Sequence, residues 1–272
     1  MKKLTFLLLL VSTLLFSQTH RIFYELKFKK DSLSDYYDKD YYVLDISKDE
    51  QKFYNYEFFQ NDSISTSKIN SDYIFSYPKM PIRLVHKKEN EFYNYYSQSP
   101  LYYLVRTNDK LTWEIQPEKK KYENFSVQKA TAKFGGRSWE AWFTTDMPFQ
   151  YGPYKFYGLP GLIMEVYDTK KNYIFTFKGN KNISDKIDTS RYIESQIGLR
   201  PNEISQKQWE KLQIDYFLNP LKDFGDGGLI VENERGEKVK ANSRDVIAGQ
   251  QNYLRKHNNP IELDKAIKYP TK

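Results

Sequence analysis

The chain contains no cysteine and only three histidines among its 272 residues. Without cysteine there is no disulfide, no thiol nucleophile and no thiolate metal site. His20, His86 and His257 are scattered and lack a ligand spacing such as H-x-x-x-H. The chain also has no G-x-S-x-G motif, and no S-x-x-K accompanied by its supporting motifs. We therefore expect no metal, no cofactor and no intrinsic catalysis.

Long hydrophobic runs are lacking after the first residues. Met1, Lys2 and Lys3 precede an apolar run over residues 4–16, and Ser17-Gln18 follows as a cleavage point. This pattern predicts a signal peptide over residues 1–17, because the run is shorter than the roughly 20 residues of a membrane span. No cysteine follows the run, which excludes a lipoprotein anchor. We expect an exported protein, periplasmic or extracellular, without a transmembrane anchor.

Aromatic and basic residues are abundant. The chain has 24 Tyr and 18 Phe, and aromatics make up 17% of it, which favours β structure. The formal net charge is +7, with a pI near 9.1. The lysines are spread over 27–30, 87–88 and 119–121, so a solvated surface explains them better than a nucleic-acid groove. A weak, salt-sensitive attraction to anionic lipid or polysaccharide stays open.

Strand patterns dominate the first two-thirds of the chain. Ile22, Tyr24, Leu26 and Phe28 alternate with residues of the opposite face, as in a half-buried strand. Two hairpins are predicted in the middle of the chain, 125–134 with 138–144 across Gly135-Gly136, and 162–167 with 173–178. Further short runs recur at residues 41–46, 52–59, 73–76, 82–86, 91–97, 101–106 and 111–115.

Helix signals appear late. Ser205 and Gln208 form a capping-box pattern, and a helix is predicted to run from there to Asn219-Pro220. A second helix is predicted over residues 244–256. No linker divides residues 18–272, so we predict one mainly β domain. Its architecture is a curved antiparallel sheet or half-barrel meander, with two or three C-terminal helices packed on it.

The segment 152–168 carries the most specific pattern. Gly152, Pro153, Gly158, Pro160 and Gly161 fall within ten residues and predict one defined loop that leads into a strand. We expect valine at Gly158 or Gly161 to cost more stability than alanine at Lys155 or Tyr157.

Residues 158–163 read Gly-Leu-Pro-Gly-Leu-Ile and resemble the signature of the GLPGLI family, exported Bacteroidetes-type proteins with no established activity. Residues 136–139 and 141–144 resemble the family's approach to this signature, and residues 258–263 also look familial. Val127 stands where many members carry a cysteine. The resemblance implies membership and says almost nothing about chemistry.

A candidate binding site surrounds this loop. Arg137, Trp142, Tyr154 and Lys155 are predicted to line a groove for a sugar, a peptide or a lipid headgroup, together with Tyr157. The alternative is that Trp142 packs under the loop and Arg137 bonds loop carbonyls. Glu165 is either part of this site or pairs with Arg137, Lys155 or a cross-strand lysine. A hydrolase would use Glu165 with Asp146 or Asp168.

Three functions remain open. The first is a non-catalytic binding or carrier protein that holds an apolar or glycan ligand in the concavity of its sheet. The second is an accessory protein that docks an outer-membrane transporter or a secretion machine. The third, a carboxylate-dependent hydrolase, ranks last because no catalytic constellation is recognisable.

Overall fold

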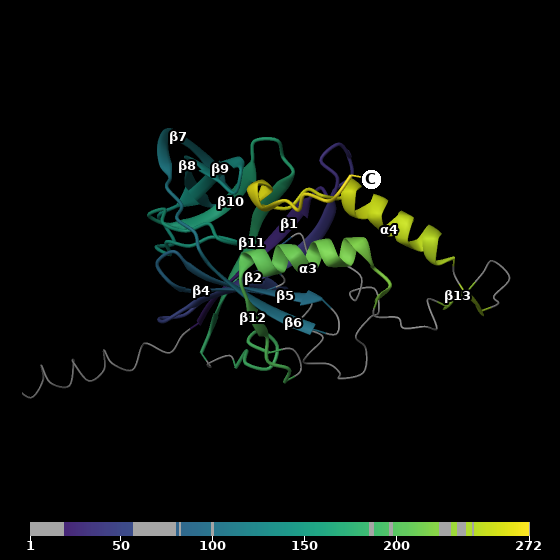
Figure 1. Cartoon of the computed structure of the whole chain (residues 1–272). Coiled ribbons are helices and arrows are strands. Elements are labelled where there is room, and N and C mark those ends of the chain that lie inside the picture. The colour runs from purple at the N-terminus through teal and green to yellow at the C-terminus, as the bar shows by residue number, and fades with distance from the viewer. Residues whose placement is uncertain are drawn as a thin grey trace, which may run out of the picture.

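The structure is a computed structural model that describes residues 19–56, 80–81, 83–98, 101–184, 188–195, 198–222, 230–232, 238–240 and 242–271. The predicted signal peptide, the predicted strand 73–76 and the loop 223–228 lie outside the described residues. Figure 1 shows the fold coloured along the chain.

A single large sheet organises the described residues. Its order is β12-β6-β5-β4-β3-β2-β1-β11-β10-β9-β8-β7, so the predicted β-rich meander is confirmed. The strands are β1 (Thr19–Phe28), β2 (Asp38–Ile46), β3 (Gln51–Asn55), β4 (Arg83–Lys88), β5 (Glu91–Gln98), β6 (Leu101–Asn108), β7 (Glu114–Tyr122), β8 (Phe125–Phe134), β9 (Arg137–Thr144), β10 (Leu162–Asp168), β11 (Tyr173–Ile183) and β12 (Asn202–Ile204).

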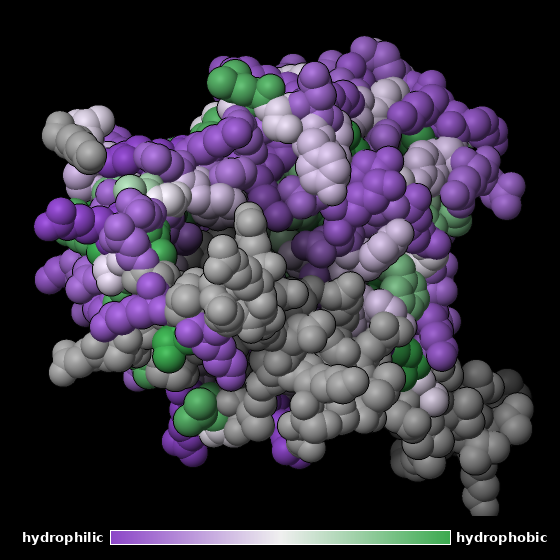
Figure 2. All heavy atoms as spheres, turned by 90° about the vertical axis from the view of Figure 1, so that its right-hand side faces the viewer, coloured by the Kyte–Doolittle hydropathy of each residue, from purple (hydrophilic) through white to green (hydrophobic). Residues whose placement is uncertain are grey.

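Two C-terminal helices, α3 (Gln206–Leu218) and α4 (Ser243–Lys256), follow the sheet, as predicted. The Ser205–Gln208 capping box is present at the start of α3. The remaining elements are the hairpin of β13 (Ile230–Glu232) with β14 (Lys238–Lys240) and the 3₁₀ turn η3 (Leu263–Lys265). No helix among the described residues is long and apolar enough to cross a membrane. Hydrophilic side chains cover most of the described surface on the side shown in Figure 2.

The sheet departs from the sequence expectation at its two edges. β12 pairs in parallel with β6, so the sheet is mixed. At the other edge, the strand expected at 111–115 instead starts at Glu114 and extends through Lys121 to Tyr122. Most of β7 is exposed, so it has no alternating apolar pattern to reveal it. Pro117 falls within its register shift, where an edge strand tolerates proline.

The sheet curls until its ends come close. β6 and β7 lie near opposite ends of the strand order, yet only residues 109–113 join them. Such a linker spans at most about 20 Å. Two adjacent residues contact strands from both halves of the sheet. The ring centroids of Phe156 and Trp139, on β9, are 4.6 Å apart, and those of Tyr157 and Phe92, on β5, are 5.8 Å apart. The inner face of the sheet therefore forms a trough.

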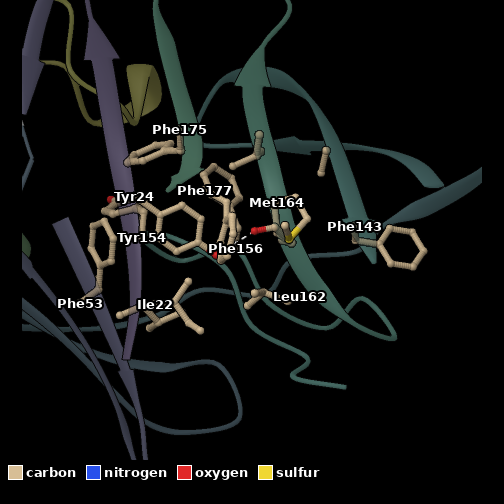
Figure 3. Close-up of a cluster of buried hydrophobic side chains, with 14 of the residues drawn as sticks. Ile22, Tyr24, Phe53, Phe143, Tyr154, Phe156, Leu162, Met164, Phe175 and Phe177 are labelled. Atoms are coloured by element: carbon tan, nitrogen blue, oxygen red, sulfur yellow. Dashed lines mark hydrogen bonds between the residues drawn. The ribbon is translucent and has the colours of Figure 1, made fainter. Parts of the chain in front are cut away.

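The loop 145–161 fills this trough. Tyr154, Phe156 and Leu159 are almost fully buried among the inner-face residues of the sheet. Figure 3 shows Tyr154 and Phe156 surrounded by side chains from β1, β3, β10 and β11, including Tyr24, whose hydroxyl donates to the Ile163 carbonyl at 2.7 Å. Burial of this kind contributes about 25 cal/mol per Å² of apolar surface. The concavity predicted for a ligand is thus occupied by the chain's own aromatic side chains.

The outer face of the sheet divides into two halves. Over β2 to β6, residues 188–195 cover it, with Ile193 buried and its carbonyl accepting from the Tyr102 hydroxyl at 2.8 Å. Lys52 fixes the same segment through Glu194 at 2.7 Å. Over β8 to β10, the outer face carries polar and aromatic side chains, of which Trp142 is buried and Glu140, Glu165 and Tyr167 are half-buried. α3 packs at the inner side of β5 and β6, where Trp209 stacks on Tyr96 at 4.4 Å.

Candidate functional site

Backbone geometry fixes the loop that enters the trough. Gly158 has φ +91°, a conformation that side chains disfavour. Gly161 has ordinary angles, but a Cβ there would lie 1.9 Å from the carbonyl oxygen of Thr144, the last residue of β9. Backbone bonds then join the loop to itself and to β10, with Gly158 N donating to Gln150 O at 2.9 Å and Leu162 N donating to Met147 O at 2.9 Å.

Arg137 lies buried under the C-terminal segment. Its guanidinium donates to the carbonyls of Ile261 at 2.9 Å and Pro260 at 2.6 Å, and to the Asn259 side chain at 2.7 Å. It also forms an ion pair with Asp168 at 3.3 Å. These contacts use the forked geometry of the guanidinium on partners within the chain. Arg137 therefore holds residues 259–261 onto the β8–β9 turn and does not face a groove.

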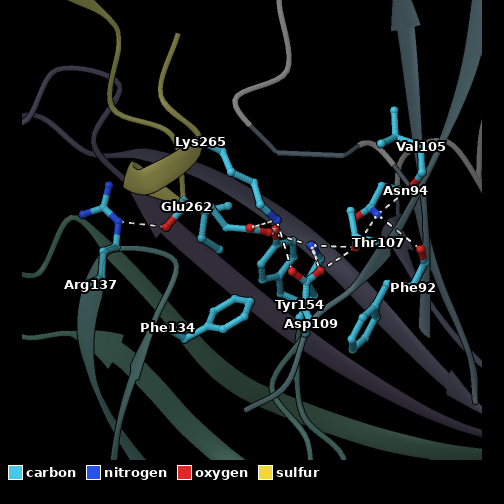
Figure 4. A network of polar contacts seen from close by, with 12 residues as sticks. Phe92, Asn94, Val105, Thr107, Asp109, Phe134, Arg137, Tyr154, Glu262 and Lys265 are labelled. Atoms are coloured by element: carbon cyan, nitrogen blue, oxygen red, sulfur yellow. Dashed lines mark hydrogen bonds and ion pairs between the residues drawn. The ribbon is translucent and has the colours of Figure 1, made fainter. Parts of the chain in front are cut away.

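Lys155 and Tyr154 meet the same segment from the loop. Lys155 Nζ lies 2.7 Å from both Asp109 and Glu262, and Lys265 lies 3.2 Å from Asp109 and also contacts Glu262. The Tyr154 hydroxyl donates to Glu262. We call these five residues the closing network (Figure 4). It joins the three segments that cross the trough: the β6–β7 linker, the loop 145–161 and the C-terminal segment.

The charges of the closing network balance, two lysines against two carboxylates. Burial alone would raise the pKa of Asp109 and of Glu262, but the ammonium groups of Lys155 and Lys265 outweigh it and hold both values below their ordinary range. Since the Lys155 side chain is only 2% exposed, it is unavailable to a soluble ligand. Arg137, Tyr154 and Lys155 thus form a structural clamp.

We predict that the closing network makes the free energy of unfolding fall at acidic pH. Because the folded pKa values of Asp109 and Glu262 lie below their unfolded values of about 4, the stabilisation is complete above that pH and is lost as pH falls through the folded values. Urea unfolding measured from pH 7 to pH 2.5 should show the free energy of unfolding falling below about pH 4. Glu262→Gln should give a shallower fall, and an unchanged slope would contradict the assignment.

The other two predicted residues, Trp142 and Glu165, lie on the outer face. They are direct partners in the β9–β10 ladder, and the next pair on that face is Glu140 with Tyr167. Lys120 from β7 places its ammonium 4.1 Å from the Trp142 ring centroid and 3.0 Å from Glu165.

Two more lysines complete this surface. Lys129 lies 3.0 Å from Glu140, and Lys171 lies 2.6 Å from the Tyr167 ring centroid. We define the outer cluster as Lys120, Lys129, Glu140, Trp142, Glu165, Tyr167 and Lys171.

Hydrogen bonds organise the outer cluster around Glu140. Trp142 Nε1 donates to Glu140 at 3.1 Å, and the Tyr167 hydroxyl also donates to it. Although partial burial opposes the effect, the bonds from Tyr167, Lys129 and Trp142 lower the pKa of Glu140. Burial and the neighbouring carboxylate raise the pKa of Tyr167 to about 12. Glu140 is therefore an ionised acceptor at neutral pH rather than a proton donor.

The outer cluster offers the chemistry of a recognition surface. Two aromatic rings lie among ammonium donors and carboxylate acceptors, on strands fixed by the sheet ladder. Across the described residues, no group of three or more His, Asp or Glu side chains is arranged to hold a metal ion.

Sequence reasoning missed several of these residues. Lys120, Glu140 and Tyr167 were not selected, although Glu140 and Tyr167 alternate with the inner-face positions of predicted strands. No local sequence pattern distinguishes Asp109 or Glu262, because they contact Lys155 only in the tertiary structure.

A known protein family matches a short segment of the chain. The family described as "Protein of unknown function (Porph_ging)" matches residues 136–165, from the β8–β9 turn to Glu165. The segment is thus similar to a Bacteroidetes-type family of unknown function, and GLPGLI membership stays a prediction. No curated protein matches the chain.

Two solved structures share the fold. "Structure of PNGF-II in C2 space group" and "Structure of PNGF-II in P21 space group" are each 15% identical to the chain and cover 72% of it, with TM-scores of 0.51 and 0.52. The matched region spans 32% and 33% of the respective PNGF-II chains. The chain thus corresponds to about a third of PNGF-II, and at this identity the likeness shows the fold alone.

Proposed function

We propose that this chain is an exported, non-catalytic binding protein of the GLPGLI type. The charged start and short apolar run of residues 1–16 support export, with residues 18–272 as one mature domain. The family match over residues 136–165 supports a relationship to Bacteroidetes-type proteins of unknown function.

The outer cluster is the proposed recognition surface, and one observation carries this proposal. Trp142, which is 9% exposed, and the half-buried Tyr167 lie on the outer face of β9 and β10, with a lysine ammonium over each ring and carboxylates beside them. We propose a glycan as the ligand. A sugar presents hydroxyl groups to ammonium and carboxylate groups, and presents C–H faces to aromatic rings.

The alternatives fit the geometry less well. Within the described residues, the trough leaves little room for an apolar ligand, because Tyr154, Phe156 and Leu159 fill it. A glycosidase needs one carboxylic acid with a raised pKa as proton donor. In the outer cluster the pKa of Glu140 is lowered instead, and Glu165 is paired with Lys120 at 3.0 Å.

The test is binding of the mature protein to a panel of neutral, amino and uronic-acid oligosaccharides, followed by titration calorimetry on any hit. We expect Trp142→Ala and Lys120→Ala each to weaken binding about tenfold, a loss of about 1.4 kcal/mol. Lys207→Ala, an exposed lysine on α3, is the matched control and should bind as the parent does.

Two outcomes would overturn the proposal. In one, no oligosaccharide binds although the melting temperature is normal. In the other, the protein hydrolyses a glycan and Glu165→Gln abolishes turnover while the fold stays intact, which would make the chain an enzyme.

A further inference from the structure

The loop between β1 and β2 exposes apolar side chains at its tip. Leu33 is 92% exposed and Tyr36 is 71% exposed, the two highest values among the large hydrophobic side chains of the described chain. The tip is held in place by its own polar groups: Asp31 accepts from Leu33 N at 2.9 Å, and Ser34 Oγ accepts from Tyr36 N at 3.0 Å. The two apolar side chains are therefore presented to solvent by a fixed backbone.

The base of this loop is anchored to two other segments. Lys29 N donates to Asn172 O at 2.9 Å, and the Tyr37 hydroxyl donates to Lys171 O at 2.7 Å, which joins the loop to the β10–β11 turn. Asn259 Nδ2 donates to Lys29 O at 2.6 Å, which joins it to the residues just after α4. These three segments lie side by side and form one end of the molecule, which we call the loop end.

The loop end carries more positive than negative charge. Asp31 accepts from the backbone of its own loop, and Asp38 forms an ion pair with Lys30 at 3.0 Å, so the charges of Asp38 and Lys30 offset each other. Over residues 29–40, 169–172 and 256–259, which include the adjoining ends of β2 and α4, the exposed or half-exposed lysines are Lys29, Lys30, Lys39, Lys170, Lys171 and Lys256, against Asp31, Asp35, Asp38 and Asp40. Six lysines against four aspartates leave a formal excess of two positive charges.

We propose that the loop end docks on an anionic lipid surface, with Leu33 and Tyr36 entering the boundary between headgroups and acyl chains. Lysines near such a surface are attracted to its negative potential, and inserted apolar and aromatic side chains add to that attraction. A stable protein partner needs about 800 Å² of contact on each side. A tip with two apolar side chains offers far less, but it suits shallow insertion.

This inference shares Lys171 with the outer cluster, but it rests on Leu33 and Tyr36, which are not members of that cluster. It also gives the basic character of the sequence a specific location. The contribution of the lysines should be lost at high salt, because charges are screened within about 3 Å at 1 M salt.

The experiment is cosedimentation of the mature protein with vesicles of phosphatidylglycerol and phosphatidylcholine, and with vesicles of phosphatidylcholine alone. At about 0.1 M salt we expect binding to the anionic vesicles only, weakened severalfold at about 1 M salt. The double variant Leu33→Ser/Tyr36→Ser should reduce the partition coefficient roughly tenfold or more.

Matched controls separate insertion from a general loss of apolar surface. Leu101→Ser/Leu199→Ser removes two exposed leucines, 47% and 59% exposed, that lie outside the loop end, and should bind as the parent does. Lys170→Gln/Lys256→Gln should weaken binding to anionic vesicles while Leu33 and Tyr36 stay in place.

The proposal is overturned if the parent does not sediment with anionic vesicles, or if the Leu33→Ser/Tyr36→Ser variant and the control variant bind equally. It is also overturned if sedimentation velocity shows a dimer that Leu33→Ser disrupts, because the tip would then contact a second copy. Trp142→Ala should leave vesicle binding unchanged, so failure of one proposal is distinguishable from failure of the other.

Discussion

Replacing Gly161 with alanine is expected to prevent folding or to lower the free energy of unfolding by more than about 4 kcal/mol. The added Cβ would lie 1.9 Å from the Thr144 carbonyl oxygen and 2.6 Å from the carbonyl carbon. Both atoms belong to the backbone at the end of β9, where Thr144 pairs with Leu162, so no side-chain rotation relieves the overlap. Relief would require the first ladder pair between β9 and β10 to separate.

Two other glycines serve as controls in the same urea-unfolding experiment. Gly158→Ala adds a Cβ that meets nothing within 4 Å but carries the strain of φ +91°, so it should cost about 1 kcal/mol. Gly249→Ala in α4 also has open space and should stabilise the helix by up to about 1 kcal/mol. A Gly161→Ala protein that unfolds at the parental urea concentration would show that β9 and β10 do not approach this closely.

Replacing Lys155 with methionine should be the most damaging change to a charged side chain. Methionine keeps most of the apolar stem but leaves Asp109 and Glu262 facing each other with only Lys265 to compensate them. Breaking a buried ion pair by removing one partner costs about 3–5 kcal/mol. For a protein of this size, that corresponds to a fall in melting temperature of about 10 °C.

An exposed ion pair provides the matched comparison. Arg106 and Glu203 lie 2.8 Å apart with side chains 48% and 54% exposed, so Arg106→Met should cost less than about 1 kcal/mol. A double-mutant cycle of Lys155→Met with Glu262→Gln should show strong coupling, because each change removes the partner of the other. If Lys155→Met costs no more than Arg106→Met, the closing network does not hold the trough shut.

These two predictions bear on one expectation drawn from the sequence. Valine at Gly158 or Gly161 was expected to cost more than alanine at Lys155, and for Gly161 the close contact with Thr144 supports that order. For Gly158 the positive φ of +91° is the strain on which the expectation rested, and the order relative to Lys155→Ala stays a prediction, because Lys155 is buried between two carboxylates.

The strands and helices were predictable because their signals are local. Alternation marks β1, and the Ser205–Gln208 box marks the start of α3 within three residues. The bounds of β7 were not predicted from the sequence, because it is an exposed edge strand. Lys119, Lys120 and Lys121 stand where a half-buried strand would alternate apolar and polar residues. Such lysines also discourage pairing with another chain at the edge.

The candidate site was only partly predictable, since its residues divide between two faces of the sheet. Alternation along β9 places Trp142 on the face opposite Trp139, and the β9–β10 ladder brings Trp142 beside Glu165. Nothing local links Lys155 to Glu262, which are 107 residues apart in the sequence. Residues chosen for their charge near the loop therefore included Arg137 and Lys155, whose charges are used inside the fold.

The anchoring of the C-terminal segment also sets an order for folding. The Asn259 side chain donates a hydrogen bond to the carbonyl of Lys29, 230 residues away in the sequence. β1 pairs with β11 as well as with its sequence neighbour β2. Such distant pairings are entropically slow to form. During synthesis, the trough lacks the bonds made by residues 259–262 until these residues have left the ribosome. For a chain that we propose is exported, this delay favours passage through a translocation channel before the fold is complete.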